Sequence, residues 1–164
     1  MQHNNRPILS PKRRERLCFL QKSLGVSFSD INLLNRAFIH PSFTGEHGMV
    51  HSESNQRLEF LGDSVIYIIG ATYLYTAYPQ DKEGILTEKR IALIREETLA
   101  ELAKDYKLGS YLLLSHGGVV SGIENESSVL ADTFEALIGA IYLDSGLDVA
   151  SDFFIGSLKK RGFI

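Results

Sequence analysis

The chain has 164 residues, of which 44% are hydrophobic, so it is long and apolar enough to fold as one domain with a sizeable core. Its single cysteine, Cys18, excludes an internal disulfide and a cysteine-rich zinc site. No apolar run is long enough to span a membrane, and the polar, basic residues 1–16 do not predict a signal peptide. We therefore expect a cytoplasmic protein without a membrane partner.

Charge is distributed unevenly along the chain, although the net value is only −3. Residues 1–16 hold five basic residues and one acidic residue, and residues 159–161 are all basic, which leaves nine basic and nineteen acidic residues elsewhere. The basic ends suit phosphate contacts, and solvated, frayed ends are an equally good interpretation. The acidic centre suits divalent cations, which would mediate phosphate contacts. We expect residues 1–10 to be a flexible basic segment and residues 11–164 to form the folded domain.

The first predicted helix starts at a serine–proline cap and runs over residues 11–24, with leucines at helical spacing, until Gly25 ends it. A second, short helix is expected to have Ser29 as its cap and to be ended by Pro41. Residues 41–51 are rich in histidine, glycine and serine and are typical of a loop.

A long helix is predicted next, over about residues 52–78, with Pro79 as its end. It is apolar on nearly every side. Gly62 and Gly70 lie inside it, where each glycine costs about 1 kcal/mol relative to alanine. Glycine inside a helix often lets another backbone or a metal site come close.

The second half of the chain predicts an amphipathic helix over residues 87–106, a glycine-rich loop over 116–126 and two further helices. The first of these begins at a serine cap near residue 127 and ends at Gly146, and the last covers about 148–160. In the amphipathic helix, Ile91, Ile94, Leu99, Leu102 and Ala103 are expected to face inward, and Glu88, Lys89, Arg95, Glu96 and Lys104 outward. No stretch shows convincing strand alternation, so the predicted fold is all-α.

Two pairs of carboxylates lie within these apolar helices. Glu59 and Asp63 are four residues apart, and Asp132 and Glu135 are three apart, so each pair shares one face of its helix. An isolated acidic pair is most often part of a solvated face. Here the pattern occurs twice among apolar neighbours that leave little room for such a face: Leu58, Phe60, Leu61, Val65, Ile66, Ile68 and Ile69, then Leu130, Phe134, Leu137, Ile138 and Ile141.

Burial of an unpaired carboxylate costs on the order of several kcal/mol, so something must compensate these groups. We predict that the two pairs face each other and form a four-carboxylate metal cage. Ligands that are all oxygen suit Mg²⁺ or Mn²⁺, and none of the five histidines stands in the Glu-x-x-His motif of a di-iron bundle. Such a cage most often serves phosphoryl transfer or phosphodiester hydrolysis. These residues alone do not separate an all-α nucleotide pyrophosphatase from a nuclease.

A family resemblance separates these two classes. The stretch Asn55-Gln-Arg-Leu-Glu-Phe-Leu-Gly-Asp63, followed by Ser64, resembles the signature motif of the ribonuclease III family. Further similar segments follow in the expected order: Ala37–Phe43 upstream, then Glu83-Gly84, Thr98–Ala103, Leu108-Gly109 and Leu130–Gly146. The resemblance covers roughly residues 15–160 and implies the helical bundle of that family's endonuclease domain over residues 11–164.

The resemblance implies a role for each carboxylate. Glu59, Asp63, Asp132 and Glu135 match the family's four catalytic carboxylates, with Glu59, Asp132 and Glu135 as the principal Mg²⁺ ligands and Mn²⁺ as a possible substitute. Asp63 would orient a water or help to hold a second metal. Glu83 matches a further acidic position near the cleft.

Three other positions bear on the resemblance. Phe60 matches an aromatic residue that inserts into a pocket of the partner subunit, although ordinary core packing would also suit it. Gln56 replaces the commoner glutamate, which removes one negative charge and implies altered tuning of an active enzyme. His40 is either a ligand or base, or a hydrogen-bonding residue in the loop before the long helix, and we favour the second because it precedes proline.

The implied function is Mg²⁺-dependent hydrolysis of double-stranded RNA by a cytoplasmic homodimer, in ribosomal and messenger RNA processing, leaving 5′-phosphate and 3′-hydroxyl ends with short 3′ overhangs. Bacterial members of this type usually carry a double-stranded-RNA-binding domain after the catalytic domain. We expect a catalytic domain cut from a longer protein, and the alternative is a naturally short form like the class that trims ribosomal RNA. Two other hypotheses stay open, a non-catalytic RNA-binding relative and the pyrophosphatase.

Overall fold

The computed structural model describes residues 9–164, and these form helices and no strand. An isolated bridge joins Ile39 to Leu113. The helices are α1 (Pro11–Leu24), α2 (Ile31–Arg36), α3 (Pro41–Glu46), α4 (Gln56–Ala77), α5 (Glu83–Ile94), α6 (Glu96–Asp105), α7 (His116–Ser121) and α8 (Ser127–Arg161). Short 3-10 turns are η1 (His51–Glu53), η2 (Leu108–Tyr111) and η3 (Ile123–Asn125). The predicted all-α fold is confirmed. The first eight residues of the expected flexible segment lie outside this description.

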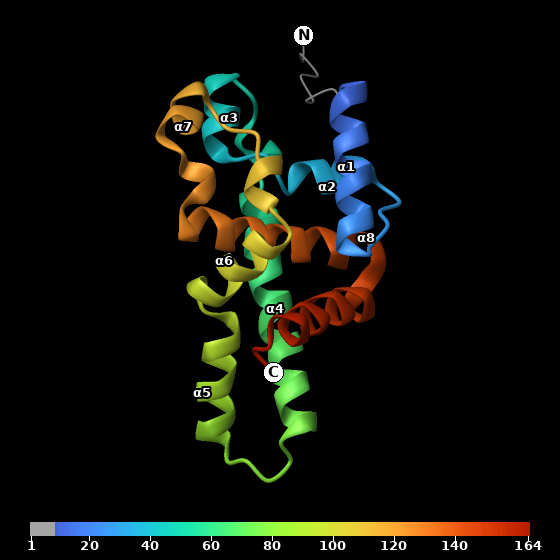
Figure 1. Cartoon of the computed structure of the whole chain (residues 1–164), viewed down its shortest axis with the longest axis vertical. Coiled ribbons are helices and arrows are strands. Elements are labelled where there is room, and N and C mark those ends of the chain that lie inside the picture. Colours follow the sequence, from blue (N-terminus) through green and yellow to red (C-terminus); the bar gives the residue numbers. More distant parts are fainter. Residues whose placement is uncertain (1–8) are drawn as a thin grey trace.

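The core is built around α4 and α8, which form the most extensive helix pair. Figure 1 shows α4 running along the long axis, the first part of α8 crossing it, and α5 beside the far end of α4. Side chains that are fully buried around this pair and under α1, α2 and α6 are Phe38, Phe134, Phe154, Leu17, Leu20, Leu34, Ile39, Ile66, Leu99, Leu102, Leu108 and Leu137. The crossing places the first turns of α4 against the first turns of α8. No helix in the described part of the chain is long and apolar enough to cross a membrane.

Helix α1 has the predicted ends. The Ser10 side chain accepts a hydrogen bond from the Arg13 N–H, and Gly25 ends the helix with a left-handed backbone (φ 70°). Arg13 then ties α1 to the rest of the fold: its Nε donates to Asn35 Oδ1 (2.8 Å) and one Nη donates to the carbonyl of Tyr111 (2.7 Å).

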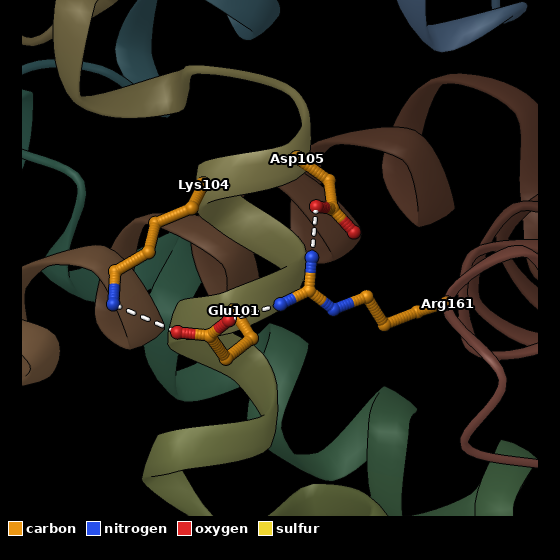
Figure 2. A network of polar contacts seen from close by, with 4 residues as sticks. All are labelled: Glu101, Lys104, Asp105 and Arg161. Atoms are coloured by element: carbon orange, nitrogen blue, oxygen red, sulfur yellow. Dashed lines mark hydrogen bonds and ion pairs between the residues drawn. The ribbon is translucent and has the colours of Figure 1, made fainter.

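The end of α8 is tied to α6 by a second polar network (Figure 2). The Arg161 guanidinium donates to Asp105 Oδ1 at 2.6 Å and to a carboxylate oxygen of Glu101. Lys104 pairs with the other oxygen of Glu101 at 2.8 Å. These side chains are partly exposed, so the network contributes only modestly to the stability of the fold.

The single amphipathic helix predicted over residues 87–106 is wrong. The chain forms α5 from Glu83 and α6 from Glu96, and Arg95 between them is extended (φ −66°, ψ 155°). The Thr98 hydroxyl donates to the carbonyl of Ala92 across the break (2.8 Å). Ile91 was expected to face inward, but it is 53% exposed. Helix α5 extends beside the far end of α4, away from the other helices (Figure 1).

Two predicted loops contain short helices. Pro41 was expected to end a helix, but it occupies the first turn of α3, with His40 Nδ1 accepting from the Ser42 N–H as the cap. Residues 116–121 form α7, whose cap is the Ser115 hydroxyl accepting from the Gly118 N–H (3.0 Å). Other boundaries are also shifted: α4 begins at Gln56 after η1, α2 is capped by Asp30, and Glu126 precedes α8 without a side-chain cap.

The predicted end of a helix at Gly146 is confirmed as a kink within α8. Gly146 has φ 87° and ψ 177°, and helix continues on both sides of it. Just before the kink, the Asp144 carboxylate accepts hydrogen bonds from the N–H groups of Ser29 (3.0 Å) and Asp30 (2.9 Å). The turn of α8 is thereby attached to the loop between α1 and α2.

Candidate metal centre

Three of the predicted carboxylates meet where α4 and α8 cross. One carboxylate oxygen from each of Glu59, Asp132 and Glu135 lies within 4.8 Å of the others. Glu59 stands in the first turn of α4, and Asp132 and Glu135 stand in the first turns of α8. Residues about seventy positions apart in the chain therefore share one small volume.

Asp63 is separate from this group of three, although it lies one turn beyond Glu59 on α4. Its charge still acts on Glu59 and on Glu135, which places it beside the cluster. The predicted cage is thus three converging carboxylates, of which Asp132 is exposed, with the fourth, Asp63, also exposed beside them. The expectation that α4 has no solvated stripe is wrong for a single chain, since Phe60 is 78% and Ile68 52% exposed.

The electrostatics of the cluster are those of crowded like charges. Burial, followed by the charges of Asp63, Asp132 and Glu59, raises the pKa of Glu135 to about 8. Burial, then Asp132 and Asp63, also raises the pKa of Glu59. In the chain from residue 9 onward, no basic side chain forms an ion pair with these four carboxylates. A divalent cation would supply the missing positive charge.

Glu96 also belongs to the surroundings of the cluster. It is exposed at the start of α6, as expected, and after burial its charge is the cause that raises the pKa of Asp132. The sequence did not predict that Glu96 lies near Asp132. The position of α6 depends on the break at Arg95, which was not predicted.

The structure does not bring Glu83 to the cluster of its own chain. Glu83 opens α5, beyond the far end of α4 from Glu59, and its Oε1 accepts from the Thr87 hydroxyl (2.9 Å). A helix of 22 residues such as α4 is about 33 Å long, which is too far for any side chain to span.

Phe60 and Gln56 lie on the outside of α4. Both line a hollow of about 560 Å³, together with Leu33, Arg36, Ser52, Arg57, Leu58, Leu61 and Leu143. His40 has the hydrogen-bonding role that the sequence favoured: its Nδ1 accepts from the Ser42 N–H (3.1 Å), and burial lowers its pKa. A neutral His40 is what this cap requires.

A cluster of carboxylates at the crossing of two helices can hold divalent cations, which is the kind of site used for hydrolysis of phosphate esters. The family model described as ribonuclease-III-like matches residues 30–161. Because this match covers most of the chain, the chain belongs to the ribonuclease-III-like family.

Individual relatives agree with this assignment. Ribonuclease 3 of Treponema denticola is 40% identical over 152 residues, which cover 93% of this chain and 61% of that protein. Ribonuclease 3 of Roseiflexus sp. is 47% identical over 138 residues, or 83% of this chain and 58% of that protein. The chain thus spans about three fifths of the length of these curated relatives.

Solved structures give the same result for the fold. The nuclease domain of ribonuclease III from Campylobacter jejuni, described as flexible in a region involved in dimer formation, has a TM-score of 0.82 at 36% identity. This similarity covers 88% of this chain and 97% of that chain. Giardia Dicer has a TM-score of 0.64 at 25% identity, over 93% of this chain and 20% of that chain.

Proposed function

We propose that residues 11–164 form the catalytic domain of an endoribonuclease that hydrolyses phosphodiester bonds in double-stranded RNA. The observation that carries this proposal is the convergence of Glu59, Asp132 and Glu135 within 4.8 Å on a ribonuclease-III-like fold. The family membership favours a nuclease over a nucleotide pyrophosphatase. Retention of all four carboxylates favours an enzyme over a non-catalytic relative.

The donor set fits Mg²⁺, with Mn²⁺ as a substitute. Three carboxylates offer oxygen ligands, and their raised pKa values reflect burial and unneutralised negative charge. We assign Glu59, Asp132 and Glu135 as the ligands. When bound, the metal supplies a Lewis acid that stabilises charge on the reacting phosphate and lowers the pKa of water.

The protein's own contribution is to orient the reactants. We assign to Asp63, which is exposed beside the cluster, the role of orienting the attacking water or helping to hold a second cation. Attack on phosphorus with departure of the 3′ oxygen leaves a 5′-phosphate and a 3′-hydroxyl. We propose short 3′ overhangs, and ribosomal and messenger RNA processing in the cytoplasm, on the family resemblance alone.

We propose that the active form is a homodimer in which Phe60 is a contact residue. In a two-fold dimer the same patch of each copy meets itself. Phe60 is 78% exposed at the rim of the hollow that it helps to line, so the Phe60 of each copy can enter the hollow of the other. Further exposed apolar residues lie on α4 and α5: Tyr67, Ile68, Tyr75, Ile85 and Ile91.

The test compares substrates in the presence of Mg²⁺ and with the cation removed by a chelator. We expect double-stranded RNA to be cut internally with the ends described above, and single-stranded RNA of the same sequence and free nucleotides to be left intact. Binding without cleavage, in either Mg²⁺ or Mn²⁺, would favour the non-catalytic alternative. Release of pyrophosphate from free nucleotides, with the duplex intact, would favour the pyrophosphatase.

A further inference from the structure

The helices that carry the cluster touch backbone to backbone at two glycines. A Cβ atom at Gly62 of α4 would lie only 1.8 Å from the carbonyl oxygen of Glu135 on α8. A Cβ atom at Gly139 of α8 would lie 2.3 Å from the carbonyl oxygen of Leu58 on α4. The two contacts are reciprocal, because each glycine meets the residue four positions before the other glycine.

These contacts involve the carboxylate-bearing turns themselves. The backbone carbonyl of Glu135 is the group that faces Gly62, and the side chain of Glu135 is one of the carboxylates of the cluster. Leu58 directly precedes Glu59, and Gly62 directly precedes Asp63. The separation of the two backbones at the glycines therefore sets the separation of the carboxylates on α4 from those on α8.

We infer that Gly62 and Gly139 are positioning residues for the divalent cation, holding α4 and α8 at the distance at which Glu59, Asp132 and Glu135 share one ion. Mg²⁺ demands near-ideal geometry with oxygen ligands at about 2.0–2.1 Å. A Cβ at Gly62 would have to move from 1.8 Å to at least 3.0 Å from the Glu135 oxygen. Asp132, with a single methylene in its side chain, has little reach to follow. This inference rests on the proposed function only in requiring that the cluster binds a cation.

The other glycines of the same helices provide matched controls. A Cβ at Gly70 of α4 would meet only side-chain atoms of Arg90 and Ile94, each at 3.7 Å. A Cβ at Gly156 of α8 would have nothing within 4 Å. Gly70→Ala and Gly156→Ala thus make the same chemical change in the same helices without pushing α4 and α8 apart.

The experiment is a calorimetric titration with Mn²⁺ alone, without RNA, combined with urea unfolding of each variant in a chelator. We expect Gly139→Ala to weaken Mn²⁺ binding by about 10- to 100-fold, the range seen when groups supporting a metal ligand are removed. Gly62→Ala, with the closer contact, should weaken it further, while both control variants should bind like the parent. Leu20→Ala, at a fully buried position of α1, is a destabilised variant on a helix that carries no carboxylate of the cluster, and it should keep the parent affinity.

A longer ligand supplies a second readout that a merely structural role would not move. If α4 and α8 have parted, Asp132→Glu in the Gly139→Ala background should recover part of the Mn²⁺ affinity. Folded glycine variants that bind Mn²⁺ like the parent would overturn the inference and leave the proposed function intact. Failure of both variants to fold would also overturn it, because the glycines would then serve the fold alone. A parent chain that binds no Mn²⁺ would instead reject the proposed metal centre.

Discussion

Glu135 is the most strongly perturbed residue of the cluster. Burial and the charges of Asp63, Asp132 and Glu59 raise its pKa to about 8, so it holds a proton at neutral pH when no cation is present. A metal ligand must be deprotonated, and cation binding therefore competes with this proton.

We expect Mn²⁺ affinity to rise with pH between 6 and 8 and to level off above the pKa of Glu135. Asp63→Asn removes one of the negative charges that raise this pKa, so the same rise should occur at lower pH. Calorimetric titrations at several pH values measure both profiles. An affinity that does not change with pH would show that Glu135 is no ligand.

The same group makes the cation-free domain less stable as pH rises. The unfolded chain releases this proton near the ordinary value of 4.5, whereas the folded chain keeps it up to about 8, so stability is lost across that window. Glu135→Gln should abolish this loss and stabilise the domain at pH 8 by roughly 1–2 kcal/mol, a discounted figure because the carboxylate is partly solvated. Urea unfolding in a chelator at pH 5 and pH 8 measures it. Glu97→Gln, at an exposed carboxylate, is the control and should change little.

Residue spacing was sufficient to find the carboxylates, but not their relative positions. Their two positions on each helix follow from the helical repeat, which is local. The separate place of Asp63, and the approach of Glu96 to Asp132, depend on how α4, α6 and α8 are rotated and packed. Local sequence patterns do not encode that packing.

At the scale of elements, the bend of α8 at Gly146 is a clear test of the fold. Its backbone (φ 87°, ψ 177°) lies in a region that is essentially restricted to glycine. Gly146→Ala should destabilise the domain by about 1–3 kcal/mol. Gly156→Ala in the same helix has ordinary helical geometry and open space, so it should stabilise by up to about 1 kcal/mol. Equal thermal stability of the two variants would contradict the kink.

The elements that sequence could not resolve share a physical cause. The amphipathic period continues across Arg95 without a proline or glycine, so nothing local indicates the break between α5 and α6. Proline is common both in the first turn of a helix and just after the end of one. Pro41 was predicted to end the preceding helix, but it begins α3. Long, strongly apolar helices such as α4 were predictable because burial repeats along their whole length.

For the whole molecule, Phe60 links the single chain to the proposed dimer. A phenylalanine that is 78% exposed beside a hollow should be covered in the functional form. Phe60→Ala should weaken self-association by at least about tenfold, as loss of a central aromatic contact of 1.4 kcal/mol or more would do. Analytical ultracentrifugation measures this. Phe19→Ala, at an exposed phenylalanine of α1, is the control, and a parent that stays monomeric would contradict the proposal.

The cluster at the α4–α8 crossing is the proposed catalytic centre, and the proposed function depends on it more than on any other feature. The most direct measurement is the single-turnover cleavage rate of a double-stranded RNA in saturating Mg²⁺, for the parent and for Glu135→Gln. We predict a loss of more than about 100-fold, because removing a ligand should exceed the 10- to 100-fold cost of losing a group that only supports one. Cleavage by a folded Glu135→Gln variant at the parent rate would show that the cluster is not the catalytic centre.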